Sequence, residues 1–120
     1  GGVLEFSLDG GAWFDVAAAG SGASLVSNGY NATLSSTGAP DSRNPLAGRF
    51  AWSGASGGFV PVVVALTDSA KYAGHALRVR WRLGTIGMGA SAGWFVDDAT
   101  LSGIGPPPSV PPAGTQLLID

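Results

Sequence analysis

The chain has no cysteine and few charged residues. Cysteine is absent from all 120 residues, which excludes disulfide bonds, thiolate catalysis and cysteine-based zinc sites. Charged residues make up 12% of the sequence, about half of the usual share of roughly a quarter. With six Lys and Arg residues and a net charge of −2 the chain offers no basic field, so we expect no nucleic-acid partner. Stability must come from a hydrophobic core or from bound metal.

Long apolar runs and histidines are also scarce. No stretch approaches the roughly 20 apolar residues that span a bilayer, so no membrane partner is expected. His75 is the single histidine, and a zinc site or a Ser-His-Asp triad would have to form around that one imidazole. We therefore predict no catalytic residues. The sequence opens at Gly1 rather than at Met, and we interpret it as a piece of a larger secreted protein.

Apolar residues that alternate with polar ones at period two predict an all-β fold. The clearest case is 76–83, where Leu77, Val79, Trp81 and Leu83 would face a core and three arginines the other side. Further strands are expected at 4–8, 12–16, 30–35, 49–53, 59–66 and 94–101. We expect 59–66 to be buried, 17–28 and 36–45 to be loops, and 69–74 to form one helical turn. Such a pattern is typical of a two-sheet antiparallel β-sandwich or jelly roll.

Proline marks the end of the expected domain. The segment 105–112 holds five prolines, which favour a polyproline-II tether and cannot enter the interior of a sheet. We predict a β-sandwich domain over 1–104, a proline-rich linker over 105–114, and a tail or the start of a next strand over 115–120.

Asp97 and Asp98 form the first candidate site. Adjacent residues of a strand point to opposite faces, and both faces carry large apolar groups here, so at least one carboxylate should be partly buried. A buried carboxylate needs a cation, an arginine or backbone N–H groups. Three interpretations stay open. The first is a structural Ca²⁺ held with Glu5 and loop carbonyls, and the second is a salt bridge to the arginine row, which consists of Arg78, Arg80 and Arg82. The third is a catalytic pair, which the divergence of the two side chains disfavours.

The aromatic residues form the second candidate site. By strand phase, Trp52, Trp81 and Trp94 are expected in the core. A sugar-binding face would present an exposed aromatic platform, and the better candidates for exposure and ligand binding are Trp13, Tyr30 and Tyr72.

Five segments carry a resemblance to a known family. They are 1–13 (GGVLEFSLDGGAW), the turn 28–31, the stretch 44–54 with Asn-Pro-Leu-Ala-Gly-Arg and Ala-Trp-Ser-Gly, the run 80–85 (RWRLGT) and 93–98 (GWFVDD). In this order, over residues 1 to about 103, the chain resembles the MAM-like jelly-roll domain appended to secreted bacterial peptidases of the immune-inhibitor-A type.

The resemblance implies a jelly roll outside a catalytic domain, with a structural metal near Glu5, Asp97 and Asp98. The chain departs from the family pattern at Ile86, where the family usually has an acidic residue, and this weakens a cation site at that loop. The family also has a strand that leads into Gly1 and Gly2, so the sandwich would lack its first strand or take it from another chain.

These observations lead to one predicted function and one alternative. We expect a non-catalytic accessory domain of a secreted, extracellular bacterial hydrolase, namely a peptidase, that serves stability, positioning or substrate attachment. Its expected partners are the rest of the parent protein and a polysaccharide or protein substrate. The alternative is a carbohydrate-binding module.

Overall fold

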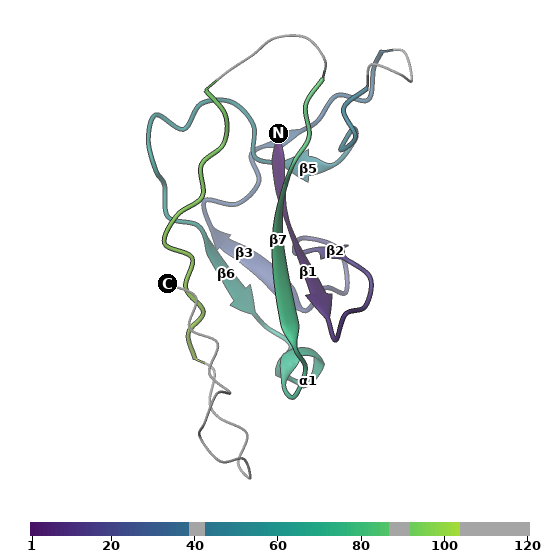
Figure 1. Cartoon of the computed structure of the whole chain (residues 1–120), viewed down its shortest axis with the longest axis vertical. Coiled ribbons are helices and arrows are strands. Elements are labelled where there is room, and N and C mark those ends of the chain that lie inside the picture. Colours follow the sequence, from purple (N-terminus) through teal and green to yellow (C-terminus); the bar gives the residue numbers. More distant parts are fainter. Residues whose placement is uncertain (39–42, 87–91, 104–120) are drawn as a thin grey trace.

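The chain is built mostly of short strands. The computed structural model describes residues 1–38, 43–86 and 92–103, and Figure 1 shows their arrangement. Its elements, in chain order, are β1 (Gly2–Leu8), β2 (Phe14–Asp15), β3 (Ala23–Ser27), β4 (Ala32–Thr33), β5 (Phe50–Ala51), β6 (Val63–Leu66), α1 (Ser69–Tyr72) and β7 (Leu77–Leu83). With a single four-residue helix in the described residues, the fold is all-β, as predicted.

The strands form three small antiparallel sheets. The largest has the order β2-β1-β7, and β3 pairs with β6 and β4 with β5. The predicted first hairpin is confirmed, because Glu5 pairs with Asp15 and Phe6 with Phe14. A backbone bridge between Gly2 and Trp52 connects β1 to the chain just after β5.

β1 lies at the centre and is buried along nearly its whole length. Its side chains alternate between two faces: Val3 packs in one apolar cluster with Leu34, Leu46 and Ala51, on the face that also holds the buried polar residues Glu5 and Ser7. Leu4 and Phe6 point into a second cluster that contains side chains from β7, β3 and β6. The β2-β1-β7 and β3-β6 sheets therefore share one core.

The register between β1 and β7 decides where the arginine row lies. Glu5 pairs with Arg80, with Ser7 opposite Arg78 and Val3 opposite Arg82. Residues that pair across an antiparallel ladder have side chains on the same face, so the arginines share the face of Glu5. The predicted alternation of β7 is confirmed, because Leu77 and Val79 pack into the second cluster on the other face. The burial expected for Trp81 and Leu83 is wrong, since these residues are 38% and 51% exposed.

Two element predictions are wrong. The segment 17–28 contains β3, which pairs with the valine-rich β6; a tertiary partner overrides the weak strand propensity of an Ala/Gly/Ser-rich segment. The expected strand at 94–101 does not form. Asp98 has a left-handed backbone (φ 53°), and its N–H donates to Asp97 Oδ1 at 2.8 Å, so the backbone turns locally instead of joining a ladder.

The apolar run 59–66 is less buried than expected. Phe59 is 74% exposed, and Val60, Val62 and Val63 are 40–49% exposed. Only the end of the run pairs in β6, and Val64 and Leu66 pack against the core. The predicted linker at 105–114 and the tail at 115–120 lie outside the described residues. None of the described helical residues forms a segment long and apolar enough to cross a membrane.

Candidate functional site

A buried carboxylate and two guanidinium groups form the centre of the charged face. Glu5 is 4% exposed, and its Oε1 accepts a hydrogen bond from Arg49 Nη1 at 2.8 Å. Its Oε2 accepts from Arg80 Nε at 2.8 Å and also from Arg80 Nη2. Arg82 Nη1 lies 3.9 Å from Oε1. Both oxygens of the buried carboxylate are thus engaged by cations.

Asp15 extends this network, and we call Glu5, Asp15, Arg49 and Arg80 the Glu5 cluster. Arg49 bridges the two acids, since its Nη2 donates to Asp15 Oδ2 at 2.6 Å. Tyr30 completes the arrangement: its hydroxyl accepts from the Leu4 N–H at 3.0 Å and donates to Asp15 Oδ1 at 2.9 Å. Burial, together with the Asp15 carboxylate, raises the pKa of this hydroxyl, so Tyr30 stays a protonated donor.

The charge of Glu5 is fixed by its surroundings. Burial alone would raise the pKa of Glu5, but the hydrogen bonds and charges of Arg49 and Arg80 outweigh burial and hold this pKa below its ordinary value of 4.5. A carboxylate held ionised by two guanidiniums is a poor general acid at neutral pH, because its proton affinity is far from the operating range. The cluster therefore suits a structural role.

Acid should weaken the fold through Glu5. A carboxyl group whose pKa is lower in the folded state than in the unfolded state adds stability above the unfolded pKa, here about 4.5, and this stability disappears as the pH falls through the folded pKa. We expect the wild-type chain to lose more unfolding free energy between pH 6 and pH 3 than Glu5→Gln does. Urea titrations at both pH values measure this, and equal losses would contradict the role of Glu5.

Trp13 lies over the arginine row. The guanidinium carbon of Arg80 is 4.2 Å and that of Arg78 5.0 Å from the centre of the Trp13 ring, which is cation–π distance. Trp13 is half-buried. Of the three aromatic residues predicted to bind a ligand, Trp13 is therefore the one whose ring lies against the arginine row and is partly open to solvent.

The other two aromatic candidates are used inside the fold. Tyr72 is 8% exposed and its hydroxyl donates to the Ser21 carbonyl at 2.5 Å, so its expected exposure is wrong. Tyr30 is half-buried and stacks edge-on against Trp52, with ring centres 4.7 Å apart. Their positions are those of core and framework residues.

Asp97 and Asp98 are placed apart from Glu5. Both are exposed, which differs from the partial burial expected of one of them, and the structure gives neither a salt bridge to the arginine row. In the part of the chain that the structure describes, no three Asp, Glu, His or Cys side chains converge as metal ligands. The predicted set of Glu5, Asp97 and Asp98 is not assembled around one point, and the arginines occupy the oxygens of Glu5.

A calcium ion at Asp97 and Asp98 would then depend on backbone and water oxygens. Calcium binding by the folded chain predicts that excess EGTA lowers the melting temperature and that added Ca²⁺ restores it. The same scans on Asp97→Asn/Asp98→Asn should show no response to EGTA. An unchanged wild-type melting temperature would end the calcium prediction.

His75 contacts a single carboxylate. Its Nδ1 pairs with Asp9, whose other oxygen accepts the Ala76 N–H at 2.8 Å. Together these contacts tie the first hairpin to the start of β7. The histidine and Asp9 thus have a local structural explanation.

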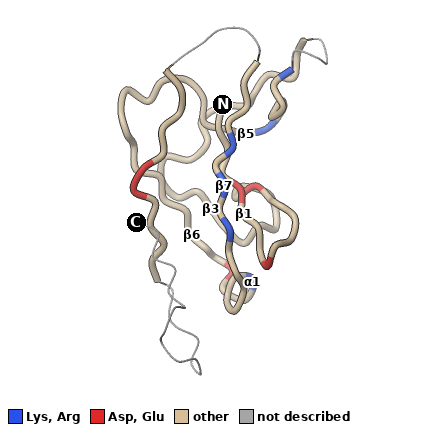
Figure 2. Tube along the Cα trace, viewed as in Figure 1, with Lys and Arg blue, Asp and Glu red and all other residues tan. Residues whose placement is uncertain are grey.

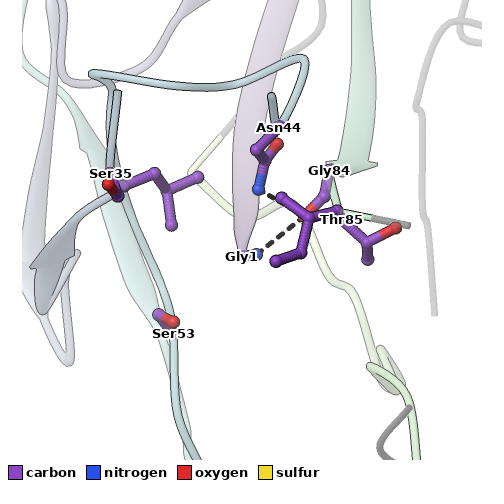
Figure 3. Close-up of a pocket in the computed structure, with 8 residues that line it drawn as sticks. Gly1, Ser35, Asn44, Ser53, Gly84 and Thr85 are labelled. Carbon is purple, nitrogen blue, oxygen red and sulfur yellow. Dashed lines mark hydrogen bonds between the residues drawn. The ribbon is translucent and has the colours of Figure 1, made fainter. Parts of the chain in front are cut away.

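An open hollow of about 290 Å³ lies beside the start of β1 (Figure 3). The Gly84 carbonyl there accepts from the Gly1 amino group at 2.8 Å and from Asn44 Nδ2 at 2.9 Å. Ile86, the position at which the sequence departs from the resembled family, is among the lining residues. The described lining side chains are hydroxyls, the Asn44 amide and the apolar Leu34 and Ile86, so the hollow has no acidic or basic side chain.

The Glu5 cluster was only partly visible in the sequence. A lone glutamate inside an apolar strand signals a buried charge, and the arginine alternation signals a cationic face. One of the three open interpretations paired Asp97 or Asp98 with that face, whereas the structure places Glu5 there. Arg49 carried no signal, because it lies 44 residues from Glu5 and meets it only in the tertiary fold, whereas Asp15 lies opposite Glu5 in the predicted first hairpin.

The described structure defines an all-β protein with a charged cluster on one face of its central sheet. In comparisons with family models, curated proteins and solved structures, nothing matches this chain.

Proposed function

We propose that this chain is a non-catalytic accessory domain of a secreted bacterial hydrolase, and by resemblance of a peptidase. It would serve stability, positioning or substrate attachment. In this proposal the β2-β1-β7 and β3-β6 sheets belong to the two layers of a jelly roll, which is supported by the apolar cluster that they share.

The observation that carries the proposal is the use of the resemblance residues in internal contacts. Arg49 binds Glu5, as described above, and Asn44 donates to the Gly84 carbonyl at 2.9 Å. These residues come from three of the five segments that resemble the peptidase-associated domain. Side chains that join distant segments stabilise the folded domain, and an appended non-catalytic domain requires such internal stability.

The tryptophans of the same segments pack in the same way. Trp94 lies against Gly2, where an added Cβ would be 2.6 Å from its ring, so glycine is required for this close approach. Trp94 and Trp52 have ring centres 6.0 Å apart. The resemblance motifs at 1–13, 44–54 and 93–98 thus meet at one place around the start of β1.

Two measurements test the proposal. The purified chain should hydrolyse neither casein nor soluble polysaccharides above the buffer background, and the coding sequence beside it should encode a catalytic domain, for a metallopeptidase one with a His-Glu-x-x-His motif. Turnover by the purified chain that Asp98→Ala or Glu5→Gln abolishes would overturn the proposal. A melting scan of each variant separates lost activity from lost folding.

The alternative function, carbohydrate binding, is favoured by one observation. Trp13 is half-buried and stacked with two arginines, which places an aromatic ring next to charged donors at the surface. This arrangement also indicates what an attachment domain could attach to.

A further inference from the structure

We propose that the arginine strip of β7, with Trp13, binds an anionic polysaccharide. The strip consists of Arg78, Arg80 and Arg82, with Trp13 above it. This inference deepens the proposed function, because it names the class of substrate to which the accessory domain would attach.

The first argument is geometric. The three arginines occupy every second position of β7 and share one face. Strand residues rise about 3.3 Å each, which places the Cα atoms of Arg78 and Arg82 about 13 Å apart. Figure 2 shows the positive positions following one another along β7, with the acidic pair 97–98 on a different segment. A straight row of cations fits a linear ligand with recurring negative groups.

The second argument is the charge balance. The face gathers four arginines, Arg49, Arg78, Arg80 and Arg82, around the carboxylates of Glu5 and Asp15. This leaves two positive charges in excess, although the chain as a whole has a net charge of −2. Asp9 lies beside Ala76 at the end of the sheet, where His75 and the Ala76 N–H bind its carboxylate. The strip is therefore a local cationic site on an acidic protein.

The third argument is that two arginines keep donors available. Arg80 binds Glu5, and its guanidinium group also contacts the face of the Trp13 ring. Among the described residues Arg78 has no carboxylate within salt-bridge distance, and Arg82 reaches one only at 3.9 Å. Both arginines are exposed. Planar guanidinium groups bind carboxylate and sulfate through paired hydrogen bonds, which makes free arginines specific anion ligands.

The shape of the face selects a polymer over other anions. A small ligand needs a concave pocket, and the hollow of about 290 Å³ has none of these arginines among its lining residues. A protein interface needs an apolar centre depleted of charge, whereas this strip is charged throughout. Nucleic acid is disfavoured because three arginines are few beside the roughly 6–10 phosphate contacts of a nucleic-acid-binding protein. A polysaccharide with carboxylate or sulfate groups needs neither a concave pocket nor an apolar centre, and its recurring negative groups can follow the strip. Trp13 adds a flat surface for a sugar ring.

The experiment is affinity electrophoresis and calorimetry of the whole chain with three probes. Polygalacturonate carries carboxylates, heparin carries sulfates, and dextran is neutral. We expect binding to an anionic polymer at about 20 mM salt that weakens strongly at about 0.5 M, because screening shortens the range of the charges. No binding to dextran is expected. The relative affinities for polygalacturonate and heparin identify the anionic group.

Variants locate the site on the strip. Arg78→Gln and Arg82→Gln should each weaken binding about tenfold, since each removes a charge-assisted hydrogen-bonding group. The matched control is Arg43→Gln, which removes the same charge from a residue whose Nε donates to the Gly38 carbonyl away from β7. Trp13→Phe should weaken binding less than the arginine changes. Melting scans confirm that each variant is folded.

Several results would overturn the inference. They are no binding to either anionic polymer, binding that Arg78→Gln and Arg82→Gln leave unchanged, and equal losses with Arg43→Gln. If the arginine variants only increase self-association, the strip is a guard against edge-to-edge pairing of β7 and the inference fails. Binding of dextran alone would refute the inference and leave the accessory function standing. Catalytic turnover by the chain would refute the accessory function and leave the binding data unaffected.

Discussion

Replacing Glu5 with glutamine is expected to lower the free energy of unfolding by about 3 kcal/mol. Glutamine has nearly the same size, so the substitution removes the charge and one acceptor without opening a cavity. Arg49 and Arg80 would then lose the anion that both bind. The loss is costly because Arg49 and Arg80, whose side chains are 29% and 37% exposed, keep partly desolvated charges without that anion. Urea unfolding followed by tryptophan fluorescence measures the change.

With the wild type and both variants measured in excess EGTA, Asp97→Asn is the control for this experiment, because it neutralises an exposed carboxylate. Its effect should stay within about 0.5 kcal/mol, as for most surface changes. A double-mutant cycle with Arg80→Gln should show the two single losses to be strongly non-additive, since both break the same contact. Additive losses, or a Glu5→Gln variant as stable as the wild type, would show that the cluster does not stabilise the fold.

Truncation of Phe6 to alanine should cost about 4 kcal/mol. Phe6 is 5% exposed and makes edge-to-face contacts with Phe14 and Tyr72, with ring centres 6.3 and 6.2 Å apart. These rings join β1 to β2 and to α1. Alanine would leave a cavity at the point where the sheets share their core, and such a cavity collapses only in part. Thermal and urea unfolding both report this loss.

Phe95→Ala provides the same chemical change at a residue that is 68% exposed. We expect its effect to stay within about 0.5 kcal/mol. Similar losses of stability in both variants would contradict the prediction that the buried Phe6 contributes far more than the exposed Phe95. If neither variant loses stability, the shared core is not the main source of stability.

The arginine strand shows how far a local pattern reaches. Alternation over 76–83 predicts a strand, and the structure has this strand at 77–83 with its arginines on the predicted face. It does not predict how deep the strand is buried, and Trp81 and Leu83 are exposed although they share the phase of Leu77 and Val79. How deeply each end of the strand is buried depends on which other segments of the chain cover it.

The Glu5 cluster shows the limit of the same reasoning. Arg49 and Arg80 lie 44 and 75 residues from Glu5 in the chain, and no spacing rule connects residues at such separations. The acidic pair Asp97 and Asp98 was the more conspicuous motif. Its strand does not form, because a left-handed residue interrupts the extended backbone, and its carboxylates remain exposed.

The residues by themselves determined the all-β class, the first hairpin, β7 and the cationic side of that strand, because each depends on side-chain periodicity and turn chemistry within about ten neighbours. Only the tertiary structure decided that Glu5 is the partner of the arginines, that 23–27 becomes a strand and that 94–101 does not. Each of these outcomes depends on which distant backbone or charge is close enough to satisfy a hydrogen bond. Proximity of that kind arises from packing the whole chain around β1.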